Sequence, residues 1–168
     1  MSEKQVLAAD ILSTTTALLT SGAILSISLF EIPNLLSTPS TTSLPQLRAL
    51  FSRGSHVVPP AASASLAIYA WLAYHADRAG HLDRRNGYVA AAVGVASIMP
   101  FTTLVMLPAA NGRLIEMEEN RKRRGGEVSG GEEREEKELL RRFWWMNTVR
   151  GLLMGVGGVV GIWTAMTR

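Results

Sequence analysis

The stretch Ile11–Phe30, ILSTTTALLTSGAILSISLF, decides the fold class because none of its twenty residues carries a charge. At about 1.5 Å per helical residue, about twenty residues cross a hydrocarbon core of roughly 30 Å. Three further charge-free runs follow at Val57–Tyr74, Tyr88–Asn111 and Gly151–Thr167. The sequence therefore predicts an all-α protein with four membrane-spanning helices.

A soluble bundle of buried helices is the alternative for this pattern. Four helices that are apolar on all sides could not cover one another in a chain of 168 residues. A signal peptide is the alternative for the first run, but the preceding Met1–Gln5 carries one Lys and one Glu and is only weakly positive. We expect this helix to be retained as a membrane span.

The chain is expected to form a single domain, residues 1–168, with spans near 8–32, 57–75, 88–108 and 143–166. The first connection is predicted from about Ser37 to Ser55, which would place Pro59 and Pro60 in the first turn of the second span. Glu alternates with Lys and Arg through the extramembrane segment 112–141, on both sides of a glycine-rich hinge. The predicted fold is a four-helix transmembrane bundle with a long, charged, partly helical loop between helices three and four.

Composition excludes several classes of function. The chain has no cysteine, so structural disulfides, thiolate-held metals and dithiol exchange are excluded. Its net charge of +3 comes from basic residues at the membrane edges, where they contact lipid headgroups rather than nucleic acid. The sequence contains no histidine pair placed to hold haem, no phosphate-binding glycine loop and no serine-hydrolase elbow.

Unusual polar residues gather at one mouth of the predicted bundle. Antiparallel spans bring the end of the first and third helices to the start of the second and fourth. This mouth then holds His56, Asn111, Asn147 and Arg150, together with Glu31, Arg53, Phe143 and Trp145. Ionisable groups at membrane depth are costly and normally face a cavity or each other. The residues therefore point to a general base beside an arginine and two amides.

Each of these residues also has a purely structural interpretation. His56 could donate to a loop carbonyl, Arg150 could reach lipid phosphate, and Glu31 could pair with a nearby arginine. Trp144 and Trp145 suit the aromatic belt of a membrane interface. Convergence at one mouth favours instead a binding site for a flat, partly polar ligand.

Three segments carry a resemblance to a known family: residues 53–60 (RGSHVVPP), 100–111 (PFTTLVMLPAAN) and 145–150 (WMNTVR). In order and spacing they resemble the DUF1772 family, which includes the anthrone oxygenases of aromatic polyketide pathways. The resemblance covers most of the chain apart from the charged segment. Asn147 matches a position where relatives have His or Asn, whereas Glu31 departs from an apolar position.

The resemblance implies an oxygenase that converts an anthrone to an anthraquinone with O2 as co-substrate and without a metal, flavin or other cofactor. His56 would remove the methylene proton, and Arg150 with Asn111 or Asn147 would stabilise the enolate oxygen. The residues expected to bind substrate are Asn111, Asn147, Trp145, Phe143, Arg53 and Glu31.

The expected location is the endoplasmic reticulum or another endomembrane. The expected partners are the anthrone substrate and membrane lipids but no nucleic acid, and self-association into a homo-oligomer stays open. The alternative function is a non-catalytic membrane protein that binds or scaffolds a polyketide, a lipid or a partner protein.

Overall fold

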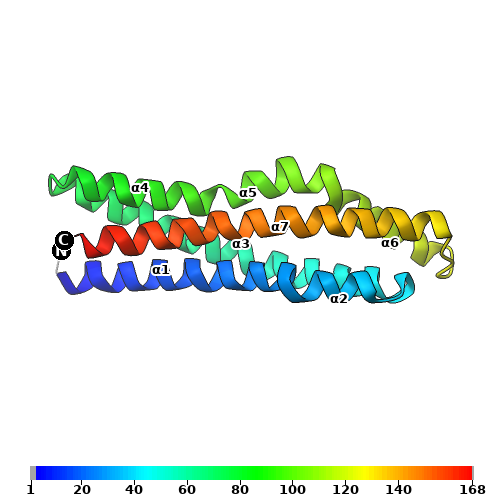
Figure 1. Ribbon diagram of the computed structural model, residues 1–168. Coiled ribbons are helices and arrows are strands. Elements are labelled where there is room, and N and C mark those ends of the chain that lie inside the picture. Colours follow the sequence, from blue (N-terminus) through cyan, green and yellow to red (C-terminus); the bar gives the residue numbers. More distant parts are fainter. Residues whose placement is uncertain (1–2, 168) are drawn as a thin grey trace.

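The computed structural model describes residues 3–167 as four antiparallel helical columns (Figure 1). The first column contains α1 (Glu3–Ser26), the π-helical segment η1 (Ile27–Glu31) and α2 (Ile32–Ser37), and the second is α3 (Ser40–Arg78). The third contains α4 (Leu82–Ala96), α5 (Ile98–Pro100), the π-helical segment η2 (Phe101–Asn111) and α6 (Gly112–Arg123), and the fourth is α7 (Gly130–Met166). The predicted all-α fold with four candidate membrane spans is confirmed.

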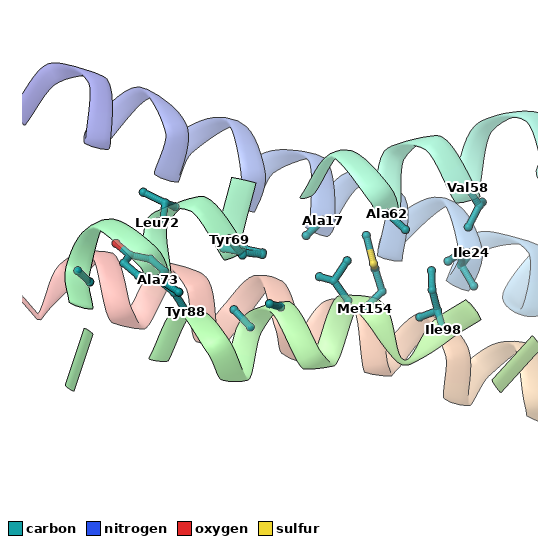
Figure 2. Close-up of a cluster of buried hydrophobic side chains, with 14 residues drawn as sticks. Ala17, Ile24, Val58, Ala62, Tyr69, Leu72, Ala73, Tyr88, Ile98 and Met154 are labelled. Atoms are coloured by element: carbon teal, nitrogen blue, oxygen red, sulfur yellow. The ribbon is translucent and has the colours of Figure 1, made fainter. Parts of the chain in front are cut away.

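The four columns form a square in cross-section. Helix α1 packs against α3 and α7, and α4 packs against the same two helices from the opposite corner. Both ends of the described chain lie at the same end of the bundle (Figure 1). In this half the core is formed by residues from all four columns, including Ala17, Val58, Tyr69, Ile98 and Met154 (Figure 2).

Glycines of α7 allow the columns to approach closely. A Cβ atom on Gly157 would lie 2.9 Å from the carbonyl oxygen of Ala91 in α4. Gly151 lies equally close to α1, and the Ser21 hydroxyl donates to its carbonyl at 2.8 Å. Small residues of this kind stabilise helix pairs in lipid, because association there depends on close packing and interhelical hydrogen bonds.

A band of exposed apolar side chains marks the part of the bundle that fits a membrane. On α7 the band runs from Trp145 to Met166, which at about 1.5 Å per residue corresponds to about 32 Å. Exposed apolar side chains end at a similar level on the other columns, at Phe30, Val57 and Leu107. The band matches the roughly 30 Å of a hydrocarbon core and therefore defines the membrane half of the protein.

Beyond the band the columns continue as a charged extension, made of residues 32–53, 112–123 and 130–142. It has its own apolar core, which includes Ile32, Leu44, Leu47, Leu114 and Leu140. The expected helical extensions on either side of a glycine-rich turn are therefore present in α6 and the start of α7. The sequence did not reveal that these extensions pack against α2 and α3.

A buried ion pair joins three columns of the charged extension. Arg121 of α6 donates to Glu136 of α7 at 3.0 Å, and both side chains are almost fully buried. Ser43 of α3 donates to the same carboxylate, while Arg121 also donates to the carbonyl of Ser40. Buried charges are tolerated when such partners satisfy them, so this cluster fixes how the extension packs.

The predicted first connection is wrong. Only Thr38 and Pro39 separate α2 from α3, so Pro59 and Pro60 lie in the middle of a 39-residue helix rather than in its first turn. Proline in a helix interior removes a backbone donor and normally kinks or ends the helix. Here α3 continues because its first half packs into the core of the extension through Leu44 and Leu47.

Prolines coincide with the two π-helical segments. Pro33 follows η1, and η2 begins directly after Pro100 and contains Pro108. A proline cannot donate the usual bond to the carbonyl four residues earlier, and wider turns relieve the clash of its ring. The hydroxyl of Thr102 donates back to Ile98 at 2.7 Å and satisfies one carbonyl at the start of η2. Pro100 and Pro108 thus disturb the regular α-helical geometry of the third column.

Candidate functional site

A cavity of about 240 Å³ lies where η2 replaces regular α-helix, at the level where the membrane half meets the charged extension. Its walls come from η1, α3, α5, η2, α6 and α7, and most of the lining is apolar. A larger hollow of about 660 Å³ at the opposite end is open and lined mainly by polar residues near the α3–α4 turn. Ligand sites are usually mostly apolar cavities with a few convergent polar groups, which the first cavity matches.

Arg150 is the charged group of this cavity. It lies on α7, where Gly151 and Met154 pack into the bundle and hold the helix in place. One terminal nitrogen of the guanidinium is 3.5 Å from the Thr102 hydroxyl, which is the limit of a hydrogen bond. Its Nε is buried and has no hydrogen-bond partner among residues 3–167. A buried, unpaired donor is costly, so this guanidinium is placed to receive an acceptor from a ligand.

Asn111 supplies a complementary group. It is the last residue of η2 and is 9% exposed. Its side-chain oxygen is buried and accepts no hydrogen bond from the described part of the chain. Arg150 and Asn111 both line the cavity, so its wall contains a residue that donates hydrogen bonds and a residue that can also accept them, a combination that suits a ligand with both a carbonyl and a hydroxyl group.

Two aromatic rings form one wall of the cavity. Phe143 of α7 is buried, and its ring centroid lies 5.2 Å from that of Phe51 in α3 at an interplanar angle of 58°. Both residues line the cavity. Tilted aromatic rings of this kind offer flat apolar surface, so the wall suits a planar aromatic ligand.

The structure separates Asn147 from this group. Asn147 is fully buried between α7 and the first column, where its Nδ2 donates to the Ile24 carbonyl at 2.8 Å and to the Ser28 hydroxyl at 3.0 Å. It does not line the cavity. Its amide nitrogen instead joins α7 to the first column at the start of η1, and its Oδ1 is buried without a hydrogen-bond partner among the described residues.

His56 also lies outside the lining of the cavity. Its side chain is exposed, and Nδ1 is 2.6 Å from the Ser52 carbonyl one turn earlier. The same nitrogen is 3.5 Å from the hydroxyl of Ser55, and Ser55 does line the cavity. His56 therefore stands next to the rim, with its ring turned toward its own helix.

The remaining predicted residues, Glu31, Arg53 and Trp145, lie on the outer surface of the bundle. Glu31 and Arg53 are exposed, and within residues 3–167 Glu31 forms no ion pair with Arg53 or Arg150. Trp145 is 60% exposed and stacks loosely on Trp144, with 6.2 Å between ring centroids. These positions at the edge of the apolar band are typical of interfacial anchors.

Of the predicted site residues, the structure thus brings together Arg150, Asn111 and Phe143. Sequence reasoning missed the residues of α3 and η2 that complete the cavity, among them Phe51, Gly54, Thr102 and Thr103. They lie in or beside the same sequence segments as the predicted residues. Most are small or apolar, and nothing in a single sequence separates such residues from ordinary packing positions.

The described residues contain no group of three or more His, Cys, Asp or Glu side chains that could hold a metal ion. Comparison with curated proteins and with solved structures found no match. Among protein families, the sequence model of anthrone oxygenases matches residues 47–160, which is more than half of the chain. This range includes α3 from its second turn, all of η2 and α6, and most of α7.

Proposed function

The chain belongs to the anthrone oxygenase family, and from this premise we propose that it oxidises an anthrone to an anthraquinone with O2 in aromatic polyketide biosynthesis. We place the reaction in the endoplasmic reticulum or another endomembrane. The observation that carries the proposal is the Arg150 guanidinium, with its unpaired Nε, at an apolar cavity with an aromatic wall. An anthrone is planar and apolar, so it fits the apolar cavity and its aromatic wall. Its one central carbonyl can accept a hydrogen bond from the arginine.

In the proposed complex the rings lie against Phe51 and Phe143, and the carbonyl oxygen accepts from Arg150. Asn111 would accept from a phenolic hydroxyl beside that carbonyl, which hydroxylated anthrones carry. A guanidinium that meets a neutral carbonyl binds an enolate oxygen more strongly, because the enolate is negatively charged. Arg150 therefore favours loss of a proton from the methylene carbon opposite the carbonyl.

The reaction balances with O2 as the only oxidant. Deprotonation gives an enolate, which passes one electron to O2 and forms a substrate radical and superoxide. These combine at the former methylene carbon to form a C–O bond, and protonation gives a hydroperoxide. Loss of the second proton from this carbon breaks the O–O bond, forms the new carbonyl and releases water. Because the enolate itself reduces O2, we propose that no metal or flavin is required.

We propose His56 as the first proton acceptor. The other two histidines of the chain, His75 and His81, lie near the α3–α4 turn at the opposite end of the bundle. His56 directly follows Ser55 at the rim of the cavity. It would accept a proton from the part of the substrate that projects through the rim, directly or through one water molecule.

The test uses the purified protein in lipid nanodiscs with anthrone under 18O2, under 16O2 and under argon. We expect quinone formation well above that of empty nanodiscs, one 18O atom per product, no reaction under argon and no loss of rate with a metal chelator. Arg150→Gln in matched nanodiscs controls for spontaneous oxidation on protein surfaces. Binding of anthrone without faster oxidation would contradict the proposal and favour a membrane binding or scaffold protein.

A further inference from the structure

The cavity is open on one side of the bundle. Helix α3 packs along α4 on one side of the cavity and against α6 on the other. Between these two contacts, the backbones of α3 and η2 within the described chain lie farther apart than those of the other neighbouring columns. The square of columns is therefore closed except between α3 and η2, where both line the cavity.

The part of the rim that lies on the third column faces lipid rather than water. On the third column it is formed by Met99, Thr103 and Leu107, which line the cavity and are also exposed. Met99 is 43% and Leu107 is 48% exposed, and both belong to the apolar band of the membrane half. The Thr103 hydroxyl donates to the Met99 carbonyl at 3.1 Å, so it adds no free polar group to the rim. Such a surface is compatible with hydrocarbon.

On α3, the opposite rim contains a glycine, which has no side chain to narrow the opening. Gly54 lines the cavity, and a Cβ atom built on it would meet no other atom within 4 Å. A glycine in a helix interior costs about 1 kcal/mol relative to alanine. The close packing that explains Gly157 does not apply at Gly54, because the space beside it is empty. The empty space beside Gly54 belongs to the opening between α3 and η2.

We propose that the site takes its planar aromatic substrate sideways from the bilayer, through the opening between α3 and η2, and that Gly54 keeps this opening wide enough. The inference rests on the proposed function for the identity of the substrate, but not for the existence of the route. Asn111 is buried and Arg150 is half-buried, whereas Met99, Thr103 and Leu107 are exposed, so the substrate would enter with its carbonyl edge first. The small cavity holds the carbonyl edge of the central ring, while the methylene carbon on the opposite edge stays near the rim.

The chain has no cysteine, so single cysteines can be introduced and labelled cleanly. Thr103→Cys places a thiol on the rim, and Leu104→Cys is its matched control, because Leu104 is the next residue, is 75% exposed and does not line the cavity. Each variant is purified in nanodiscs and labelled with a bulky, membrane-soluble maleimide. Labelling after folding avoids any effect of the bulky group on assembly.

If the route is correct, labelled Thr103→Cys loses at least ten-fold in kcat/KM for anthrone, whereas labelled Leu104→Cys stays within two-fold of its unlabelled form. Excess anthraquinone, used as a non-reacting probe, slows the labelling of Thr103→Cys but not that of Leu104→Cys. Equal effects of the label at both positions, or no protection of Thr103→Cys, would overturn the route. Protection of Thr103→Cys in a protein that does not oxidise anthrone would retain the route and overturn the proposed function instead.

Gly54→Leu provides an independent variant, with Gly22→Leu as control, because Gly22 on α1 also has no atom within 4 Å of a built Cβ but does not line the cavity. We expect Gly54→Leu to raise KM at least five-fold for three-ring anthrone while Gly22→Leu leaves it unchanged. Unchanged KM in Gly54→Leu would contradict the role of this glycine.

Discussion

Asn147 and Arg150 lie three residues apart on α7, yet their side chains serve different neighbours. The Asn147 amide donates to the Ile24 carbonyl at 2.8 Å and closes the contact with the first column. Arg150 lines the cavity beside η2 and keeps an unpaired Nε. Residues three apart on a helix are neighbours on its surface. A small difference in direction therefore separates a structural contact from a ligand site, and the two can be tested separately.

Asn147→Ala is expected to destabilise the protein without changing substrate affinity. The variant removes interhelical hydrogen bonds to Ile24 and Ser28, which in membrane proteins contribute about 0.5–2 kcal/mol. Thermal unfolding in detergent should show a lower midpoint, while KM for anthrone at low temperature stays the same. Thr148→Ala is the control, because its hydroxyl bonds only within α7. A large rise in KM at unchanged thermal stability would return Asn147 to the substrate site.

Arg150→Gln is expected to lower kcat for anthrone oxidation about 100-fold, the usual effect of removing one donor to a developing oxyanion. The kcat of Arg150→Lys should fall between those of the natural protein and Arg150→Gln, because lysine keeps the charge but loses the planar fork of donors. Steady-state kinetics by absorbance of the quinone would measure both, with size-exclusion chromatography as the test of folding. Activity of Arg150→Gln within two-fold of the natural protein would show that this arginine serves only as an anchor to lipid headgroups.

His56→Ala is expected to lower kcat by about 100-fold if the histidine accepts the substrate proton. Because His56 is exposed, added imidazole should reach the vacated position and restore part of the activity. His75→Ala is the matched control on the same helix, at the far end of the bundle, and should retain activity with no response to imidazole. Full turnover of His56→Ala without imidazole would show that water or another group takes the proton.

The charged extension gives a prediction about stability alone. Glu136→Leu leaves Arg121 as an uncompensated buried charge, which typically costs about 3–5 kcal/mol, whereas the double variant Arg121→Met with Glu136→Leu should recover most of this loss. Chemical unfolding of the four proteins in a double-mutant cycle measures the coupling. Arg142→Ala is the control, because its pair with Glu138 is exposed and should contribute little. Additive effects of the two single changes would contradict a coupled pair.

The sequence by itself determined the number of membrane helices and the charged extension. Whether a run such as Ile11–Phe30 enters a membrane depends on the transfer free energy of its own residues, so no neighbour is needed to predict it. The helical propensity and charge pairing of residues 112–141 are similarly local properties. The positions of Arg150, Asn111 and Phe143 near one another also followed from the order of antiparallel spans.

Only the tertiary structure decided which side chains face the cavity. A π-helical turn takes up about one more residue than an α-helical turn and so rotates everything after it by about 100° relative to a regular helix. The faces of residues beyond Phe101 therefore cannot be read from a 3.6-residue period. The continuation of α3 through Pro59 and Pro60 likewise depends on packing of Leu44 and Leu47 against other columns, and it sets His56 beside the rim rather than within the cavity. Contacts between segments far apart in the chain decide these features, and local sequence does not contain them.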